Sequence, residues 1–453
     1  MKLTFYGGAG MVTGANYLLE DEKNKFLIDC GLYQGSNFCE QQNFEPFPYN
    51  PQEIDYVFIT HAHIDHIGRL PKLYRENFNG KIYSTPPTKD FAEFLLIDSE
   101  HLLREEAERL KKENLYDFKD IEGVMKLWQK ISYHEKIEIG NFEIEFFDAG
   151  HILGSSFISF FNKKENKRIV FSGDLGNVPM PLIKPTEKLL PTDYLIIESA
   201  YGGRVHEDLE KRKEILEDVI EEVVKSNGVL LIPAFALERT QELLYELNDL
   251  VENQKIPAIP IFIDSPLAIN LTMVYKKYSQ DPMYFNELAI DLFKKGDDVF
   301  DFKNLKMTFT SEQSKEILFV KPPKVIIAGA GMSNGGRIIH HEVQYLNDPK
   351  NIILFIGYQA EGSLGRKILD GEKEVKILDK KIEVKCQVRS ISGYSAHADQ
   401  KQILNWIYPV KKDIRKIFIV QGEKEQAEIL SQKIKDELVV DSYIPQQGEQ
   451  IEL

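Results

Sequence analysis

The first part of the chain alternates short apolar runs with turns, and these runs have the length and composition of β-strands. We predict strands at residues 3–6, 16–19, 26–31, 56–60, 137–147, 168–172 and 194–198. Residues 87–130 interrupt them with opposite charges at helical spacing, which is typical of a solvated helix face. Antiparallel strands that precede any helix predict an α+β arrangement for this part of the chain.

After residue 203 the pattern changes to strands and helices in alternation. We predict strands at 229–235, 259–264, 324–328 and 351–357, and helices at 240–251, 267–278, 337–346 and 364–369. Such alternation predicts an α/β domain with a parallel, doubly wound sheet. We therefore expect a first domain at 1–202, an inserted domain at 203–383, and a closing part of the first domain at 384–453.

Length and composition limit the class of protein. A chain of 453 residues with 43% hydrophobic and 28% charged residues is typical of a globular protein of about two to three domains. No apolar run approaches the ~20 residues that span a bilayer, and the amino end lacks the apolar core of a signal peptide. The three cysteines, Cys30, Cys39 and Cys386, follow no disulfide or zinc-ribbon spacing. We expect a cytoplasmic protein without a membrane partner.

The formal net charge of −15 bears on any nucleic-acid partner. An acidic surface repels phosphates, so a protein of this charge needs a local basic groove to bind RNA. Carboxylates that hold a metal ion are also counted in that sum as free charge. The charge therefore weakens a nucleic-acid function without excluding it.

The candidate chemistry begins where His61, His63, Asp65 and His66 stand within six positions. They follow directly on the apolar run 56–60, so all four side chains leave a predicted sheet at one strand end. Imidazole and carboxylate are the ligands that Zn²⁺ prefers. A surface histidine cluster is the alternative, but such a cluster has no need of a buried strand before it. The motif predicts a metal site.

Four further strand ends carry an ionisable residue: Asp29, His151, Asp174 and Glu198. If these ends lie on one side of a sheet, their side chains converge on a single site. Asp29 either orients a ligand histidine from behind or caps a turn. Asp174, in the sequence Ser-Gly-Asp, is either a turn residue or a carboxylate that bridges two metal ions.

Several motifs together resemble a known family. The H-x-H-x-D-H run, Asp29, His151 and Asp174 are similar to the metallo-β-lactamase fold. Further stretches resemble its β-CASP branch, which includes the endonuclease subunit of the pre-mRNA 3′-end cleavage complex and bacterial RNase J. These stretches are IESAYG at 197–202, DSPLA at 264–268, GMSNGGR at 331–337, GYQAEGSLGR at 357–366 and SAHAD at 395–399. The resemblance runs from residue 3 to the end of the chain.

The resemblance implies a fold, a cofactor and an activity. The fold is an αββα sandwich into which a β-CASP domain is inserted, and the cofactor is a pair of zinc ions. By similarity, His61, His63 and His151 hold the first ion, Asp65 and His66 hold the second, and Asp174 bridges the two. The implied activity is that of a metal-dependent RNA phosphodiesterase, a ribonuclease of RNA processing or decay, which attacks with a metal-bound hydroxide.

The resemblance also implies three catalytic residues, Asp65, Glu198 and His397. His397 is similar to the family's candidate general acid, with Glu198 as its hydrogen-bond partner. A carboxylate neighbour raises the pKa of a histidine, so that the ring can donate a proton near neutral pH. Apart from the resemblance, residues 395–399 also fit the capped start of a helix.

The chain departs from the family pattern at Gln421. In the family, the strand equivalent to 417–423 usually ends in His-Gly-Glu, and that histidine completes the ligands of the second ion. An amide oxygen is a poor zinc ligand beside imidazole. We therefore expect the second ion to bind weakly, to be replaced by a harder metal such as Mn²⁺, or to be absent.

A glycine-rich loop at 329–337 lies between a predicted strand and a predicted helix. Backbone N–H groups at a helix start suit a phosphate, so Ser333, Gly335, Gly336 and Arg337 are predicted to bind a substrate phosphate. One alternative is a dinucleotide fingerprint, but its third glycine is one place late and no acidic residue ends the next strand. The other is a structural turn.

Two rival functions stay open at this stage. The first is a catalytically weakened β-CASP paralogue that serves as an RNA- or protein-binding scaffold, which Gln421 and the acidic surface favour. The second is a small-molecule hydrolase, which has no use for the inserted domain. The partner expected for the leading hypothesis is single-stranded RNA, and the sequence leaves a homodimer open.

Overall fold

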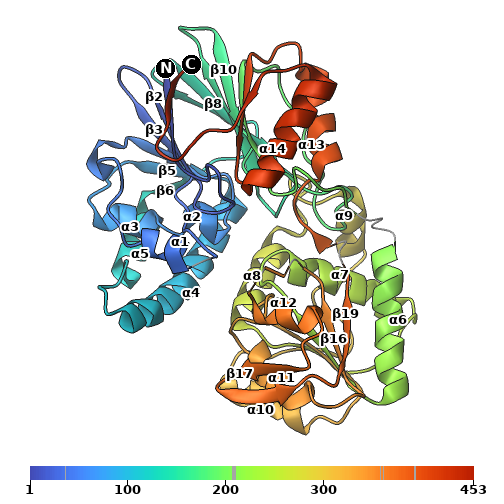
Figure 1. Ribbon diagram of the computed structural model, residues 1–453. Coiled ribbons are helices and arrows are strands. Elements are labelled where there is room, and N and C mark those ends of the chain that lie inside the picture. Colours follow the sequence, from blue (N-terminus) through green and yellow to red (C-terminus); the bar gives the residue numbers. More distant parts are fainter. Residues whose placement is uncertain (36, 207–210, 358, 361, 392–393) are drawn as a thin grey trace. The chain divides into compact units, whose positions relative to one another are not determined.

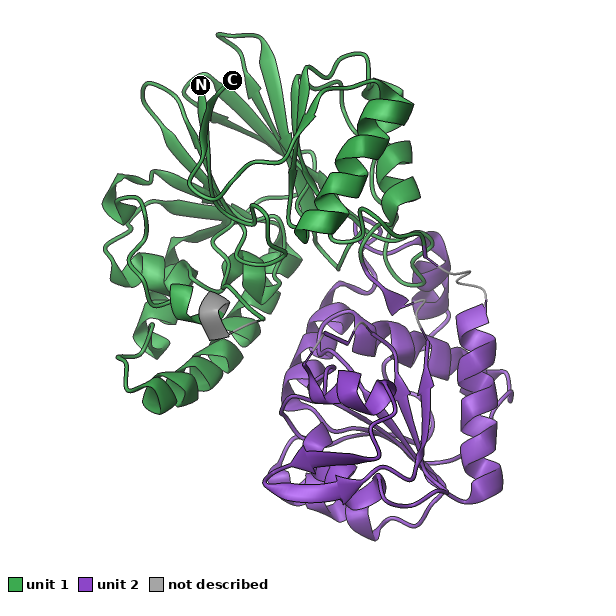
Figure 2. Ribbon diagram, in the orientation of Figure 1, with its two compact units in different colours: residues 1–205, 397–453 green, residues 206–396 purple. Residues whose placement is uncertain are grey.

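The computed structural model describes residues 1–453 except 36, 207–210, 358, 361 and 392–393 (Figure 1). The chain forms two compact units, shown in Figure 2. Unit 1 comprises residues 1–205 and 397–453, and unit 2 comprises residues 206–396. Unit 1 therefore contains both ends of the chain, and unit 2 is an insertion within it.

Unit 1 contains two seven-stranded sheets. The first has the order β22-β1-β2-β3-β4-β5-β6 and the second the order β21-β20-β11-β10-β9-β8-β7. The first sheet consists of β1 (Lys2–Gly7), β2 (Asn16–Glu20), β3 (Lys25–Ile28), β4 (Tyr56–Phe58), β5 (Lys81–Ser84), β6 (Trp128–Lys130) and β22 (Gln450–Glu452). The second consists of β7 (Lys136–Ile139), β8 (Phe142–Asp148), β9 (Ser156–Asn162), β10 (Lys167–Phe171), β11 (Tyr194–Glu198), β20 (Lys416–Val420) and β21 (Ser442–Tyr443).

Aromatic side chains fill the space between the two sheets. The ring of Phe160 lies 5.8 Å from that of Phe26 and 5.2 Å from that of Phe58, measured between centroids. The rings of Phe5 and Phe418 lie 5.6 Å apart in the same way. Because side chains alternate along a strand, the neighbours of these phenylalanines point to the outer faces and need helices to cover them.

Helices cover both outer faces of this sandwich (Figure 1). On the first sheet, buried leucines and isoleucines of α3, α4 and α5 pack on strand residues such as Leu27 and Val57. On the second, those of α13 and α14 pack on residues such as Ile417 and Ile419. The helices of unit 1 are α1 (Asn37–Gln42), α2 (Ile64–Ile67), α3 (Leu70–Arg75), α4 (Pro86–Leu110), α5 (Phe118–Leu127), α13 (Gln400–Ile407) and α14 (Lys424–Lys433). The predicted αββα sandwich is confirmed.

Unit 2 is built on a six-stranded sheet of order β14-β13-β15-β12-β16-β19, in which every neighbouring pair is parallel. Its strands are β12 (Val229–Pro233), β13 (Ile261–Ile263), β14 (Leu305–Met307), β15 (Lys324–Ala328), β16 (Ile352–Phe355) and β19 (Gln387–Ser390), and β17 (Glu374–Ile377) and β18 (Lys380–Glu383) form a separate hairpin. Every residue of β12 and β15 is buried, so both faces of this sheet are covered, as a doubly wound arrangement requires.

The helices of unit 2 follow the strands in alternation. They are α6 (Lys211–Ser226), α7 (Arg239–Glu252), α8 (Pro266–Tyr278), α9 (Glu287–Lys294), α10 (Ser311–Glu316), α11 (Ile338–Tyr345) and α12 (Leu364–Leu369). One element differs from the sequence prediction: the sequence places residues 387–390 in the closing part of the first domain, yet β19 pairs with β16 in the sheet of unit 2. The period of a strand does not reveal which sheet it joins.

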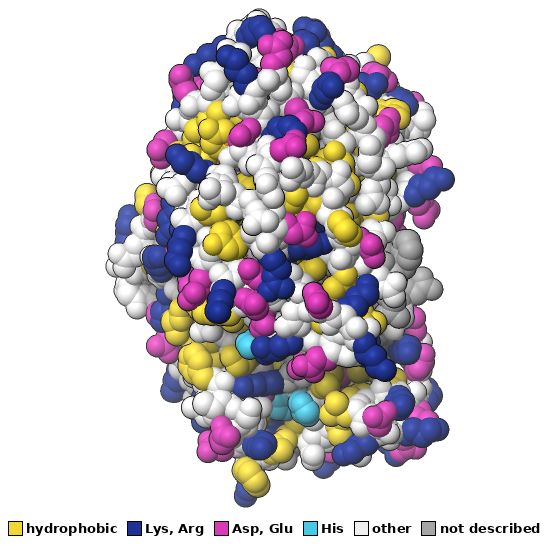
Figure 3. All heavy atoms as spheres, turned by 90° about the vertical axis from the view of Figure 1, so that its left-hand side faces the viewer, with side chains coloured by type: hydrophobic (Ala, Val, Ile, Leu, Met, Phe, Trp, Pro, Cys, Tyr) yellow, Lys and Arg dark blue, Asp and Glu magenta, His cyan; other side chains and the backbone are white. Residues whose placement is uncertain are grey.

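Lys and Arg side chains are interspersed with Asp and Glu over the face shown in Figure 3. On that face the acidic excess of the chain is thus not gathered into one continuous surface. In the part of the chain that the structure describes, no helix is long and apolar enough to cross a membrane.

Candidate metal centre

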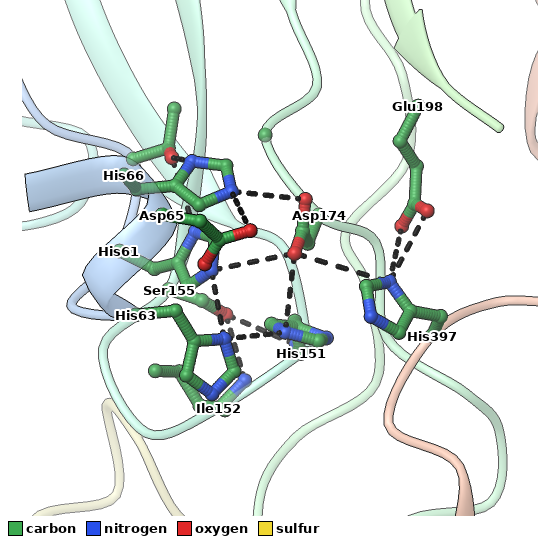
Figure 4. Close-up of polar contacts among 12 residues, drawn as sticks. His61, His63, Asp65, His66, His151, Ile152, Ser155, Asp174, Glu198 and His397 are labelled. Atoms are coloured by element: carbon green, nitrogen blue, oxygen red, sulfur yellow. Dashed lines mark hydrogen bonds and ion pairs between the residues drawn. The ribbon is translucent and has the colours of Figure 1, made fainter. Parts of the chain in front are cut away.

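Three histidines and an aspartate of unit 1 converge on one point (Figure 4). His61 Nε2 lies 3.0 Å from His63 Nδ1, which in turn lies 3.2 Å from His151 Nε2. Asp174 Oδ2 lies 3.4 Å from His61 Nε2 and 3.5 Å from His151 Nε2. Each of the four residues can offer a ligand atom, and these atoms all lie within 4.8 Å of one another. We call these four residues the histidine cluster.

The members of the histidine cluster come from three strand ends. His61 and His63 stand in the short connection between β4 and α2, His151 follows β8, and Asp174 follows β10. The approach of these connections is close: a Cβ atom at Gly173, where φ is 53°, would lie 2.7 Å from Cβ of Thr60. A larger residue at position 173 would therefore force one of these connections to shift.

The donor atoms of the histidine cluster fit a metal ion. Burial and the neighbouring His61 lower the pKa of His63 well below its usual value, and burial and His397 do the same for His151. Neutral imidazoles can offer lone pairs as ligands, and the facing nitrogens of these rings lie 3.0 and 3.2 Å apart. Three nitrogens and one carboxylate oxygen form the four-ligand set typical of zinc.

A second group of polar atoms lies on the other side of Asp174. Oδ1 of Asp174 lies 3.4 Å from His66 Nε2 and accepts a hydrogen bond of 3.0 Å from Gln421 Nε2. Asp65 Oδ2 lies 3.9 Å from His66 Nε2. Burial would lower the pKa of His66, but the charges of Asp174, Asp29 and Asp65 raise it well above its usual value. The two oxygens of Asp174 thus face two different sets of ligand atoms.

Asp29 orients His66. The carboxylate lies at the end of β3 and its Oδ2 is 2.7 Å from His66 Nδ1. It also accepts hydrogen bonds of 2.8 Å from both the backbone N–H and the hydroxyl of Thr60. With Nδ1 held by Asp29, the ring of His66 directs Nε2 towards Asp174. This contact is the one expected of a carboxylate behind a ligand histidine.

We expect Asp29→Asn to weaken metal binding by about 10- to 100-fold, because the Thr60 hydroxyl that Asp29 holds lies 3.1 Å from Nδ1 of His61, a member of the histidine cluster. Competition with a zinc-binding dye measures this affinity. Asp55→Asn is the matched control, since Asp55 is exposed and accepts from the backbone of Lys25 at 2.8 Å. Unchanged zinc affinity in Asp29→Asn would show that Asp29 only stabilises the backbone around Thr60 and does not contribute to metal binding.

His397 and Glu198 form a pair beside the histidine cluster (Figure 4). His397 Nδ1 lies 3.3 and 3.2 Å from the two oxygens of Glu198 and 3.9 Å from Asp174 Oδ2. Glu198, at the end of β11, also accepts a hydrogen bond of 2.6 Å from the backbone of Leu175. Burial alone would lower the pKa of His397, but the carboxylate of Glu198 raises it to about 9. The alternative interpretation, that residues 395–399 lead into the capped start of a helix, also holds, because the side chain of Asp399 caps α13.

The glycine-rich loop belongs to unit 2, and its polar side chains are already bonded. Ser333 is fully buried and its hydroxyl donates to Glu342. Arg337 donates from Nη1 to Asp264 Oδ1 at 2.7 Å and to the carbonyl of Thr308 at 3.0 Å, and from Nη2 to the carbonyl of Phe309 at 2.8 Å. Phosphate binding by Ser333, Gly335, Gly336 and Arg337 stays a prediction.

Asp264 has a histidine partner that no motif of the sequence pointed to. His341 lies one turn beyond Arg337 on α11, and its Nε2 is 2.7 Å from Asp264 Oδ2. The spacing of four residues between Arg337 and His341 places both on one helix face, and that spacing was the available signal.

Two packed sheets with histidines and carboxylates at their strand ends define a metal-binding hydrolase of the metallo-β-lactamase fold. Family models match three parts of the chain: the Beta-Casp domain at residues 240–368, the Zn-dependent metallo-hydrolase RNA specificity domain at 381–445, and the Anti-Pycsar protein Apyc1 at 1–224. A solved structure of a protein of unknown function from Enterococcus faecalis covers 99% of each chain with a TM-score of 0.53 and 12% identity, which supports the fold alone.

Curated relatives cover nearly the whole chain. Ribonuclease TTHA0252 of Thermus thermophilus is 34% identical over 94% of this chain and 94% of its own length. Transcription termination factor FttA of Methanocaldococcus jannaschii is 31% identical over 98% of this chain and 70% of its own length. An RNase J-like protein of the same organism is 29% identical over 98% of both chains. The chain belongs to the β-CASP family of the metallo-β-lactamase superfamily.

Proposed function

We propose that the protein is a metal-dependent ribonuclease that hydrolyses phosphodiester bonds of single-stranded RNA. The observation that carries this proposal is the histidine cluster with the pair of His397 and Glu198 directly beside it. The names of two relatives, a ribonuclease and an RNase J-like protein, and the family description that mentions RNA specificity support RNA as the substrate.

Zinc is the ion that we propose for the histidine cluster, because its donors are three imidazole nitrogens and one carboxylate oxygen. When bound, zinc supplies positive charge for the oxygens of a phosphate and increases the acidity of a bound water. The second position, among Asp65, His66 and Asp174, shares the carboxylate of Asp174 with the first.

The side chains of unit 1 divide the proton transfers between them. Glu198 accepts from His397 at Nδ1, which holds the imidazole in one orientation and leaves Nε2–H as the group that donates to the leaving oxygen. Asp65 accepts a hydrogen bond from the attacking water and so orients it. Full burial of Glu198 removes competing water from its contact with His397.

We expect His397→Ala to lower the rate of RNA cleavage by about 10²- to 10⁴-fold, because the leaving oxygen loses its proton donor. The metal content should stay that of the wild-type protein, since His397 is not a member of the histidine cluster. Single-turnover cleavage of an end-labelled single-stranded RNA, together with elemental analysis, measures both quantities. His101→Ala is the matched control, because its ring is 61% exposed on α4.

The same assay tests the proposed function itself. Zinc-loaded wild-type protein should cleave the RNA, and removal of the metal with a chelator should stop the cleavage. Protein that retains zinc and leaves the RNA intact would overturn the proposal and support a binding scaffold. A cytoplasmic location, a homodimer and a domain boundary after residue 202 stay predictions alongside it.

A further inference from the structure

Gln421 stands directly after β20 and points into the second group of polar atoms. Its backbone N–H donates to the carbonyl of Gly8 at 2.6 Å, and only 3% of the residue is exposed. A Cβ atom added to Gly8 would lie 3.2 Å from Cγ of Gln421 and 2.4 Å from the hydroxyl of Tyr17. The glutamine side chain is therefore packed from behind and has little room to turn away.

The amide nitrogen of Gln421 stands between two ligand atoms. Nε2 lies 2.8 Å from His66 Nε2 and 3.0 Å from Asp174 Oδ1, and these two atoms are 3.4 Å from each other. A cation bound by His66 and Asp174 would have to lie near both of the same atoms. The NH₂ group of Gln421 thus takes the place beside them that such a cation needs.

The orientation of the amide follows from its neighbours. If the amide were turned round, its carbonyl oxygen would face Asp174 Oδ1, and two acceptors would oppose each other without a hydrogen atom between them. Asp174 is buried, and its Oδ1 lies 3.0 Å from the amide nitrogen of Gln421. A carboxylate oxygen only accepts hydrogen bonds, so it keeps the NH₂ group directed inwards.

The histidine cluster contains no comparable group. Its four ligand atoms belong to three imidazoles and one carboxylate, and the amide of Gln421 reaches Asp174 through Oδ1 and not through Oδ2. The two positions on either side of Asp174 therefore differ. One has a full set of four strong ligands, and the other has three together with a neutral amide that donates hydrogen bonds.

We propose that the protein holds a single zinc ion tightly, in the histidine cluster, and that Gln421 prevents tight binding of a second zinc ion beside His66. This inference deepens the proposed function, and it rests on that function for the assumption that the histidine cluster binds a metal ion. A second zinc ion must displace the NH₂ group from His66 and Asp174, and it gains at best an amide oxygen, which binds zinc more weakly than imidazole.

The test is a count of zinc ions in protein that has been loaded with zinc and then separated from free metal. Elemental analysis should find about one zinc ion per wild-type chain. Gln421→His should hold about two, because an imidazole at this position completes a second set of strong ligands. A titration against a zinc-binding dye should resolve a second site at least about tenfold tighter in Gln421→His than in the wild-type protein.

Two further variants serve as controls for the zinc count of Gln421→His. Gln432→His adds a histidine at an exposed position of α14 and should leave the count at about one, which excludes adventitious binding to a new surface imidazole. Gln421→Leu removes the amide without supplying a ligand, and it should also hold about one ion. Thermal unfolding of each variant shows whether it is folded.

The possible outcomes distinguish the single-zinc inference from the proposed function. Two zinc ions of similar affinity in the wild-type protein overturn the inference, even if Gln421→His does not fold. A folded Gln421→His with one ion overturns it as well. Wild-type protein that holds one zinc ion but cleaves no RNA overturns the proposed function and leaves the inference standing, and protein that holds no zinc overturns both.

Discussion

Asp174→Ala is expected to abolish RNA cleavage, with a loss in kcat/KM of at least about a thousandfold, because charge stabilisation at the reacting phosphate disappears with the metal. The carboxylate contacts both polar groups of the site. Oδ2 lies 3.4 Å from His61 Nε2, and Oδ1 lies 3.4 Å from His66 Nε2. Its removal also leaves buried imidazoles without the negative charge that faces them.

Cleavage of single-stranded RNA and elemental analysis of the same preparations measure this loss. Asp413→Ala is the control, because Asp413 is an exposed residue of the same unit. If Asp174→Ala retained a full complement of zinc together with wild-type cleavage, neither the histidine cluster nor the proposed function could stand as described.

Asp264→Asn is expected to destabilise the protein by about 3–5 kcal/mol, the range for a buried ion pair that loses one partner. Asp264 is fully buried in unit 2. It accepts hydrogen bonds from Thr308 and Arg337 at 2.7 Å and from Ser314 at 2.6 Å, and it faces His341 Nε2 at 2.7 Å. The amide of an asparagine lacks the negative charge that balances Arg337. Its NH₂ group is a donor and would face the donors that the carboxylate accepts from.

The effect of Asp264→Asn should depend on pH. Burial opposes the ionisation of Asp264, but His341, Ser314, Thr308 and Arg337 lower its pKa below the usual value. A carboxyl group whose pKa is lower in the folded state stabilises the fold above its unfolded pKa, and this contribution is lost as the pH falls further. The difference between variant and wild type should therefore be largest near pH 7 and shrink below about pH 4.

Urea unfolding at several pH values tests both statements. Asp379→Asn is the matched control, because the side chain of Asp379 is 92% exposed and its removal should change stability by less than about 0.5 kcal/mol. A variant as stable as the wild type at pH 7 would show that the contacts of Asp264 contribute little to folding.

Much of the fold could be predicted because local patterns specify local structure. Short apolar runs bounded by turns identified most strands of unit 1, and strands alternating with helices identified the parallel sheet of unit 2. The short edge strand β14 escaped prediction, since three residues, Leu305–Met307, carry no detectable period. The local pattern also could not show which sheet β19 joins, because strand pairing depends on residues far away in the sequence.

The sequence by itself determined the chemistry of the site: which residues can bind a metal, and that each stands where a strand ends. Only the tertiary structure decided which atoms meet. His61 follows a strand of the first sheet and Asp174 follows a strand of the second, so their contact depends on the packing of two sheets. In the same way, the bonds of Arg337 to Asp264 and of Gln421 to Asp174 join residues far apart in the chain. Local sequence fixes the kind of donor at each position, whereas distances between donors arise from long-range packing, which no short pattern encodes.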